Sequence, residues 1–250
     1  MNHKLLIFIV LLMFFSCSSK KDILYLQNIS DNSNYEIKYQ PYTLKVDDIL
    51  KIEIKNLIPE ISVNDKVSNL NNNTKDSMIY SGYQIDINGN IDFNQIGEIY
   101  AAGKTLIELK NFIKKELIDN GIYTNPVVDI KLLNSYFTII GDVTKPGRYD
   151  FLENDLNILE AIGLAGDLNI TGDRRNIKLI RNNENLSSVF SIDLTESDFV
   201  RNDGFQVFPG DIIVVNPNNT KIKNAGIIGN SGTLISLLSF LLSSIIVINN

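Results

Sequence analysis

Residues 136–166 read YFTIIGDVTKPGRYDFLENDLNILEAIGLAG, and this stretch decides the fold of the second half of the 250-residue chain. Residues 137–140, Phe-Thr-Ile-Ile, predict a short strand. Residues 141–147 contain Gly, Asp, Pro and Gly, which favour a turn, and residues 148–151 predict a second short strand. The stretch therefore opens as two strands joined by a tight connection.

A capped helix follows in the same stretch. Asn157 has the residue type of a helix N-cap, and Glu160 stands three residues later, which is the spacing of a capping box. Leu159 and Ile162 are expected to face the core, and Gly166 is expected to end the helix.

The first half of the chain has the same character, with several strands and one helix. Thr105 and Glu108 form a second capping box, and the helix is expected over residues 105–120, with Gly121 as its stop. This mixture predicts an α+β fold of two β-rich units with one helix each. The strands expected elsewhere are 43–55 with a turn at Asp47-Asp48, a hairpin over 83–93 that turns at Asn88-Gly89, 127–132, 177–181, 189–194 and 211–215, and residues 56–77 are expected to form a loop.

The composition excludes several classes of protein. The net charge is −6 and no basic residues are concentrated, so nucleic acid is not an expected partner. Cys17 is the only cysteine and His3 the only histidine, so the body of the chain has neither a Cys/His zinc site nor the usual general base of hydrolases. A convincing catalytic carboxylate pair is also missing. We therefore expect no enzymatic activity, no metal and no cofactor.

The N-terminus has the form of an export signal. Lys4 precedes residues 5–15, an uncharged apolar run that is too short to span a bilayer but has the length of a signal-peptide core.

Ser16-Cys17 follows this run and resembles the bacterial lipobox, in which the cysteine is diacylated and becomes the first residue after cleavage. The resemblance implies a signal peptide over residues 1–16, a lipid on Cys17 and a lipidated lead-in over residues 17–41. Ser18 favours sorting to the outer membrane. The alternative is an ordinary secretory signal with a coincidental cysteine.

The C-terminal tail, residues 224–250, contains no charged residue and is mostly apolar. As a helix it would be long enough to span a bilayer. Four of its small or polar residues fall on one face, on which Phe240 and Val247 intrude, and such a face favours association between helices in a membrane. The alternative is a buried core helix. The residues of the small face are Gly232, Ser236, Ser239 and Ser243.

Three other motifs have simpler interpretations. Residues 86–92 mimic the start of a calcium loop, but Ile91 and Gly97 stand where that loop needs Gly and Glu, so a hairpin turn is expected. Asp47-Asp48 is not expected to act as a catalytic pair, because adjacent strand residues point to opposite faces. Arg174-Arg175 could contact an anionic glycan or a neighbouring subunit, although a solvated loop is the simpler expectation.

Two sets of residues resemble the outer-membrane polysaccharide export proteins of the Wza type. Tyr42-Thr-Leu-Lys-Val-Asp-Asp48-Ile-Leu-Lys-Ile is similar to the opening motif of their export domain, with Val46-Asp47 where Pro-Gly is usual. Gly141-Asp-Val-Thr-Lys-Pro-Gly-Arg-Tyr149 and Leu159-Glu-Ala-Ile-Gly-Leu-Ala-Gly166 are similar to their soluble-ligand-binding β-grasp (SLBB) module. The resemblance implies a β-rich export domain over residues 42–134, a ubiquitin-like SLBB domain over 135–217 and a C-terminal transmembrane helix.

The resemblance also implies a function. The chain would be a lipid-anchored subunit of an outer-membrane channel for capsular or exopolysaccharide, with its body in the periplasm. Its partners would be further copies in a homo-oligomeric ring of about eight subunits and an inner-membrane polysaccharide co-polymerase.

Each subunit would then give one C-terminal helix to the pore. The pore-lining residues would be Gly232, Ser236, Ser239 and Ser243, and the lipid-facing residues would be Leu237, Leu238, Leu241, Leu242 and Ile245. Two other functions stay open. One is an envelope enzyme that acts on glycans through a carboxylate pair, and the other is a non-porous periplasmic glycan-binding or scaffold lipoprotein.

Overall fold

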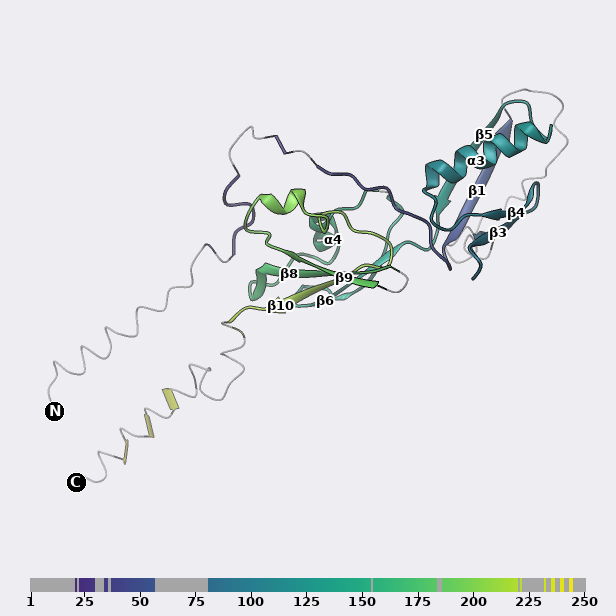
Figure 1. Ribbon diagram of the computed structural model, residues 1–250. Coiled ribbons are helices and arrows are strands. Elements are labelled where there is room, and N and C mark those ends of the chain that lie inside the picture. Colours follow the sequence, from purple (N-terminus) through teal and green to yellow (C-terminus); the bar gives the residue numbers. More distant parts are fainter. Residues whose placement is uncertain are drawn as a thin grey trace.

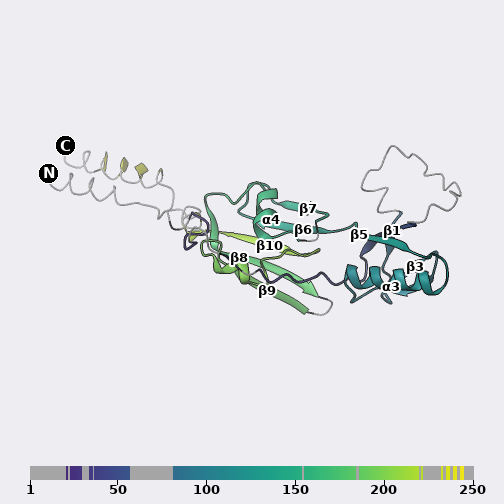
Figure 2. The ribbon, with the colours of Figure 1, turned by 90° about the horizontal axis from the view of Figure 1, so that it is seen from above.

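Two separate clusters of buried apolar side chains divide the chain into two lobes (Figure 1). The first lobe has its core among residues 44–132, and the second has its core among residues 137–215. The computed structural model describes residues 21, 23–29, 34–35, 37–56, 81–153, 155–183, 186–219 and 221, and residues 232, 235, 236, 239, 240, 243 and 244 near the C-terminus. Figure 2 shows the lobes lying end to end. The α+β class expected from the sequence is confirmed.

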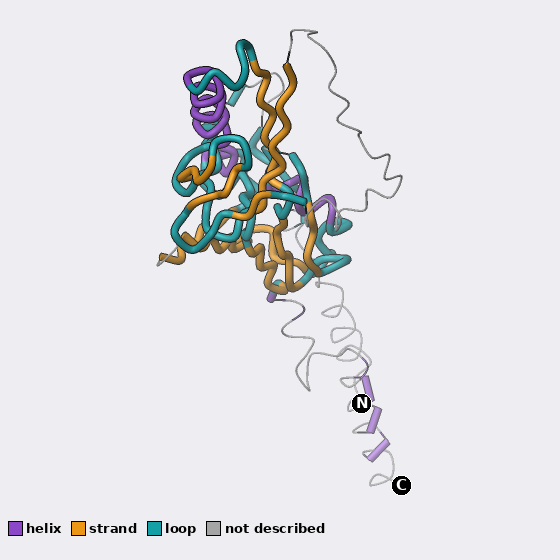
Figure 3. The backbone as a smooth tube through the Cα atoms, turned by 90° about the vertical axis from the view of Figure 1, so that its right-hand side faces the viewer, coloured by secondary structure: helices purple, strands orange, loops and turns teal. Residues whose placement is uncertain are grey.

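The first lobe places helix α3 against a three-stranded sheet of order β2-β1-β5, in which both pairings are antiparallel. Its helix lies beside the long strands of this lobe (Figure 3). Leu109, Ile113 and Leu117 form the buried face of the helix. The remaining pair, β3-β4, is a separate hairpin. The elements are β1 (Ile49–Asn56), β2 (Tyr83–Gln84), β3 (Asn90–Phe93), β4 (Gly97–Tyr100), α3 (Leu106–Asp119) and β5 (Pro126–Leu132).

The second lobe is a five-stranded mixed sheet of order β7-β6-β10-β8-β9, in which only the β6-β10 pair is parallel. Helix α4 lies on one face of this sheet (Figure 1) and buries Ile158, Ala161 and Ile162 in the core. The elements are β6 (Tyr136–Gly141), β7 (Gly147–Asp150), α4 (Ile158–Leu164), β8 (Gly172–Asn183), β9 (Leu186–Ile192), the 3₁₀ helix η3 (Asp198–Arg201) and β10 (Ile212–Pro217).

Both helices begin at the capping boxes expected from the sequence. The Thr105 side chain accepts from the backbone N–H of Glu108, and the Glu108 carboxylate accepts from the N–H of Thr105. Asn157 and Glu160 make the same reciprocal pair at α4. These side chains satisfy backbone donors that the first turn of a helix leaves free.

Strand pairing in the first lobe differs from the expected hairpin over residues 83–93. The turn at Asn88-Gly89 forms, and the Asp86 carboxylate closes it by accepting from the N–H groups of Asn88 and Asn90 at 2.9 and 2.8 Å. However, β2 pairs with β1, and β3 pairs with β4. Alternating apolar residues indicate which side chains are buried, but not which strand is the partner.

The start of the first lobe differs as well. Thr43 makes only an isolated bridge to Thr105, and the continuous strand begins at Ile49. The turn before this strand lies at Val46-Asp47, where Asp47 has a φ of 70°. An aspartate tolerates this left-handed conformation, so the turn forms without the Pro-Gly pair.

Candidate functional site

Residues 23–29, which follow the expected lipid-bearing cysteine in the sequence, dock on the second lobe. The backbone N–H groups of Leu26 and Gln27 donate to the carbonyls of Leu194 and Thr195 at 3.0 and 2.7 Å. Backbone hydrogen bonds of this kind hold the lead-in beside the end of β9 without depending on its side chains.

Tyr25 is the side chain that fastens this lead-in. Its hydroxyl donates to the carboxylate of Asp167, and the guanidinium carbon of Arg174 lies 5.2 Å from the centre of its ring. Burial and the bond to Asp167 raise the pKa of Tyr25 far above its ordinary value. The hydroxyl therefore stays protonated and keeps donating at every physiological pH.

Arg174 and Arg175 lie on β8 and not in the solvated loop that the sequence predicted. Arg175 is exposed, but Arg174 is only 4% exposed. A charged side chain tolerates such burial when it is hydrogen-bonded, and Arg174 is bonded to one turn of its own lobe. Its acceptors are the backbone carbonyls of Leu168, Asn169 and Gly172, at 3.5, 3.2 and 3.2 Å.

The C-terminal exit of the second lobe contacts the same turn. Lys221 Nζ lies 2.8 Å from Oδ1 of Asp142, whose carboxylate also accepts from Asn169 and Thr171. The N–H of Asn218 donates to the carbonyl of Thr171 at 2.7 Å. Burial alone would raise the pKa of Asp142, but the bonds from Lys221, Thr171 and Asn169 outweigh it and hold this pKa below its ordinary value.

Both ends of the lobe therefore meet at one place, which we call the anchor turn, residues 166–172. The lead-in reaches it through Asp167. The exit reaches it directly through the bond from Asn218 to Thr171, and indirectly through Asp142, which accepts from Lys221 and also from Asn169 and Thr171. The first lobe lies at the other end of the second lobe (Figure 1). The molecule thus has one end where both chain segments leave and one end formed by the first lobe.

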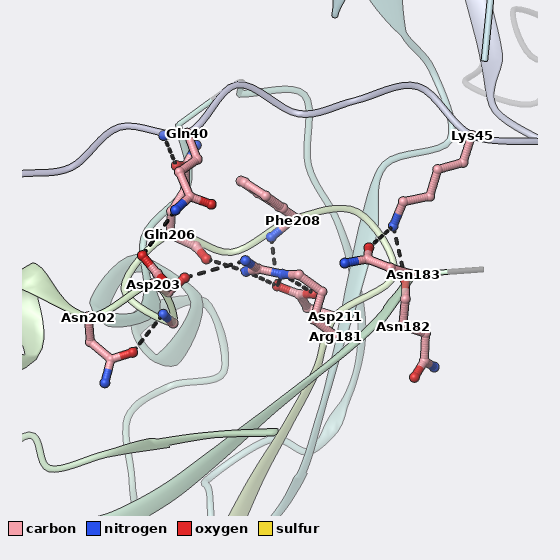
Figure 4. A network of polar contacts seen from close by, with 11 residues as sticks. Gln40, Lys45, Arg181, Asn182, Asn183, Asn202, Asp203, Gln206, Phe208 and Asp211 are labelled. Carbon is pink, nitrogen blue, oxygen red and sulfur yellow. Dashed lines mark hydrogen bonds and ion pairs between the residues drawn. The ribbon is translucent and has the colours of Figure 1, made fainter. Parts of the chain in front are cut away.

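A second polar cluster lies where the two lobes join. The Tyr42 hydroxyl donates to Asp48 at 3.0 Å, and the N–H of Lys45 donates to the same carboxylate at 2.8 Å. Lys45 Nζ crosses to the second lobe and donates to the carbonyl of Asn182 and to Oδ1 of Asn183 (Figure 4). Burial raises the pKa of Asp48 above its ordinary value, although the Lys45 and Tyr42 bonds reduce the effect.

Beneath this junction lies a buried ion pair. Arg181 Nη2 is 2.8 Å from Oδ2 of Asp211, and the two side chains are 6% and 1% exposed. The N–H of Phe208 donates to the same carboxylate, and the Arg181 guanidinium carbon lies 4.0 Å from the centre of the Phe208 ring. Figure 4 shows these residues converging below the strand-like linker that carries Gln40.

The linker is itself bonded to this cluster. The N–H of Gln40 donates to Oε1 of Gln206, and its side-chain amide donates to Asp203 at 3.0 Å. The Tyr42 ring meets the Phe208 ring edge-on, with centres 5.9 Å apart. Tyr42 therefore lies at the joint between the lobes, and Asp48 supports it from the first lobe by accepting from Tyr42 and Lys45.

A groove of about 690 Å³, open to solvent, runs along this junction. Its walls come from the linker, the start of α3, the segment after β7 and the loop before β10, and most of its side chains are apolar or aromatic. The lining residues are Tyr39, Pro41, Tyr42, Thr105, Leu106, Ile107, Leu132, Ser135, Phe151, Leu152, Glu153, Val207, Phe208 and Pro209.

The C-terminal serines are helical where the structure describes them, and each bonds its own helix. The hydroxyls of Ser236, Ser239 and Ser243 donate to the carbonyls of Gly232, Ile235 and Ser239, four residues earlier, all at 2.8 Å. Such a bond satisfies the hydroxyl within the helix. Within the described part of the chain, no helix combines the length and the apolar character needed to cross a bilayer.

The other expected site residues are placed as follows. Cys17, Leu237, Leu238, Leu241, Leu242 and Ile245 lie outside the described residues. Asp48 is buried and accepts from Tyr42 and Lys45, whereas Asp47 is exposed. Among the residues that the structure describes, no three His, Cys, Asp or Glu side chains gather closely enough to hold a metal ion.

Fold and contacts together define a class of protein. A helix-on-sheet lobe is joined through a bonded linker to a β-grasp-type lobe, and the second lobe holds both outgoing chain segments at one turn. Residues 37–133 match the family model described as polysaccharide biosynthesis/export protein, and residues 135–215 match that of the SLBB domain. The chain belongs to the polysaccharide export family.

Two similar proteins are both named EPS I polysaccharide export outer membrane protein EpsA, one from Ralstonia nicotianae and one from Ralstonia solanacearum. They are 30% identical over 105 residues and 28% identical over 104 residues, respectively. Each alignment covers 40% of this chain and 27% of the relative, so the chain matches about a quarter of the length of these relatives.

Proposed function

We propose that this chain is a lipid-anchored subunit of an outer-membrane channel that exports capsular or exopolysaccharide, and that it is not an enzyme. The observation that carries the proposal is the anchor turn, because it holds the lead-in from Cys17 and the segment toward the C-terminal tail at one end of the molecule. Family membership and the names of the Ralstonia relatives support the export role.

The position of Lys21 indicates what a lipid on Cys17 would do to the second lobe. Its carbonyl accepts from Arg175 on the surface of the second lobe at 3.5 Å, and Cys17 is four residues earlier in the chain. Four residues span at most about 14 Å. A diacylated Cys17 would therefore hold the second lobe close to the membrane, with the first lobe pointing into the periplasm.

In the proposed channel, the serines of the C-terminal tail line the pore. Since Ser236, Ser239 and Ser243 satisfy their hydroxyls within the helix, unsatisfied bonds are not a reason for them to face water. What still favours this face for the lumen is its polarity, because Gly232, Ser236, Ser239 and Ser243 form the least apolar face of a tail made mostly of Leu and Ile. Leu237, Leu238, Leu241, Leu242 and Ile245 would then face lipid or neighbouring helices.

Replacing Cys17 with serine tests the anchor. The variant has no thiol to accept the diacylglyceryl group, so it should lose the mass of the lipid. In the chain truncated after Lys223, which has no C-terminal helix to hold it, the same substitution should also release the protein from the outer-membrane fraction. The readouts are intact mass and membrane fractionation, with Ser18→Ala as the matched control. A variant that keeps the lipid mass, or a truncated variant that stays in the membrane without lipid, contradicts the anchor.

Cysteine labelling tests the pore. With Cys17 retained as the lipidated residue, single cysteines at Ser236, Ser239 and Ser243 should react with a water-soluble thiol reagent, and cysteines at Leu238 and Leu241 should not. Truncation after Lys223 should abolish polysaccharide export while the lobes still fold. Equal labelling of both faces, or export by the truncated chain, would instead support the non-porous scaffold lipoprotein.

A further inference from the structure

Among the residues that the structure describes, no helix packs on one of the two faces of the second lobe's sheet. Helix α4 packs on one face, and within the described ranges no helix covers the other (Figure 1). A row of paired residues crosses this open face, from Thr138 on β6 through Ile212 and Ile180 to Val189 on β9. Val189 is 61% exposed, and Ile140 in the neighbouring row is 44% exposed.

A positively charged side chain, Lys178, lies near the centre of this open face. The register puts Lys178 beside Val214, in the row next to Ile212 and Ile180. Its ammonium is held by the Ser191 hydroxyl at 3.1 Å. At the β7 edge, the Arg148 guanidinium carbon lies 3.5 Å from the centre of the Tyr136 ring. The carboxylate at that edge, Asp150, is bridged to Arg148.

The opposite side of the same lobe carries the complementary surface. A groove open to solvent runs from the exposed side of α4, where it is lined by Glu160 and Leu164, past Glu153 and Asp155 to Asp150 at the β7 edge. Leu164 is 50% exposed and Leu152, next to Glu153, is 67% exposed. This helix side therefore offers apolar side chains ringed by carboxylates, and the open sheet face offers apolar side chains around a lysine.

We propose that the open sheet face of one copy docks on the α4 side of the next copy, with Lys178 facing the carboxylates of the α4 groove. The occupant is a second copy because each lobe carries both halves of the contact, matched in charge and in apolar character. Sheet-to-sheet pairing by a two-fold axis would instead bring Lys178 against Lys178, which like charges oppose.

The geometry of this contact suits a ring. The two surfaces lie on opposite sides of the lobe, so the contact is heterologous, and such contacts repeat from copy to copy until they close. The inference rests on the proposed function in one respect, since it names the surfaces through which channel subunits would assemble. It would stand for an assembly of these lobes even if the C-terminal tail formed no pore.

Cross-linking tests the contact directly, because Cys17 is the only native cysteine and its thiol is occupied when lipidated. The full chain carrying Val214→Cys and Leu164→Cys together should form a ladder of covalent oligomers in membranes with a short thiol-reactive cross-linker. Val214→Cys alone should stay monomeric, since one face never meets itself. A covalent dimer from Val214→Cys alone would overturn the head-to-tail arrangement.

A charge exchange gives an independent measurement. Lys178→Glu should raise the dissociation constant of the oligomer by about tenfold or more, Glu153→Lys should do the same, and the double variant should recover most of the loss. Lys114→Glu on the exposed side of α3 is the control. Urea unfolding confirms that each variant is folded before native mass measurement in mild detergent.

The outcomes separate this inference from the function beneath it. A wild-type ring that shows no Val214–Leu164 cross-link and tolerates Lys178→Glu overturns the interface and leaves the channel standing. A wild-type chain that is monomeric in membranes overturns both the interface and the ring.

Discussion

Lys221 places its ammonium nitrogen 2.8 Å from Oδ1 of Asp142, so that a half-exposed lysine at the exit of the second lobe meets a carboxylate whose side chain is only 2% exposed. Asn169 and Thr171 complete the bonds to this carboxylate. Tyr25 reaches the same turn from the lead-in side through Asp167. The pair therefore belongs to the place where the two outgoing segments of the chain are fixed together.

Replacing Lys221 and replacing Asp142 should lower the free energy of unfolding by different amounts. Lys221→Ala should lower the free energy of unfolding by about 1 kcal/mol, because the lysine is half exposed. Asp142→Ala should cost about 3 kcal/mol, because it also leaves the Asn169 and Thr171 donors unpaired. Urea denaturation measures both values, and hydrogen exchange at residues 167–172 should rise in both variants. Equal effects of the two substitutions would contradict this account.

Asp142 and Asp48 should give stability opposite dependences on pH. The folded pKa of Asp142 lies below its ordinary value of 3.8, so its contribution is present above that value and is lost as pH falls toward the folded pKa. The folded pKa of Asp48 lies above 3.8, so its ionisation lowers stability as pH rises through the folded value.

Urea denaturation at about pH 3, 5 and 7 checks these signs. The advantage of the wild type over Asp142→Asn should grow as pH rises, and its advantage over Asp48→Asn should shrink. Slopes of the same sign for the two variants would show that one of the carboxylates is not in the environment described here.

Gly141 should be intolerant of any side chain. Its φ is 99°, and a Cβ built at this position would clash with the carbonyl oxygen of Val215 on β10. Gly141→Ala should therefore unfold the second lobe or cost about 4 kcal/mol. Gly163→Ala in α4 is the matched control, because its Cβ would meet nothing within 4 Å. That variant should gain about 0.5–1 kcal/mol, and thermal denaturation of both variants decides the comparison.

Removing one partner of the buried Arg181–Asp211 pair should destabilise the protein much more than replacing both partners with apolar residues. Arg181→Met leaves a buried, uncompensated carboxylate and should destabilise the protein by about 3–5 kcal/mol, whereas Arg181→Met with Asp211→Leu should cost much less. Lys38→Ala, which removes a solvent-exposed ion pair with Asp203, should cost under about 1 kcal/mol. A double variant as unstable as the single one would mean that the hydrogen bonds around the pair matter more than its charge.

The helices and the two-lobed α+β class were predictable because their signals are local. The capping boxes at Thr105 and Asn157 put both helix starts at the observed residues. Strand partners were not predictable in the same way: the Asn88-Gly89 turn formed, but its flanking strands paired with β1 and β4. Side-chain alternation carries no information on partners far apart in the chain.

The anchor turn and the junction were beyond the sequence for a similar reason. The sequence predicted a solvated Arg174, because the residues next to it give no sign of the backbone carbonyls that accept its hydrogen bonds in the folded lobe. Tyr25 lies 142 residues from Asp167 in the chain, so only the folded lobe reveals their contact. Asp48 carried the one usable signal, its place in the opening motif with Tyr42.

Planar-bilayer conductance of the purified, lipidated full-length chain tests the channel most directly. We expect reproducible single-channel steps from its oligomer, and we expect the chain truncated after Lys223 to show none at the same protein concentration. An intact, lipidated oligomer that gives no conductance steps would contradict the channel.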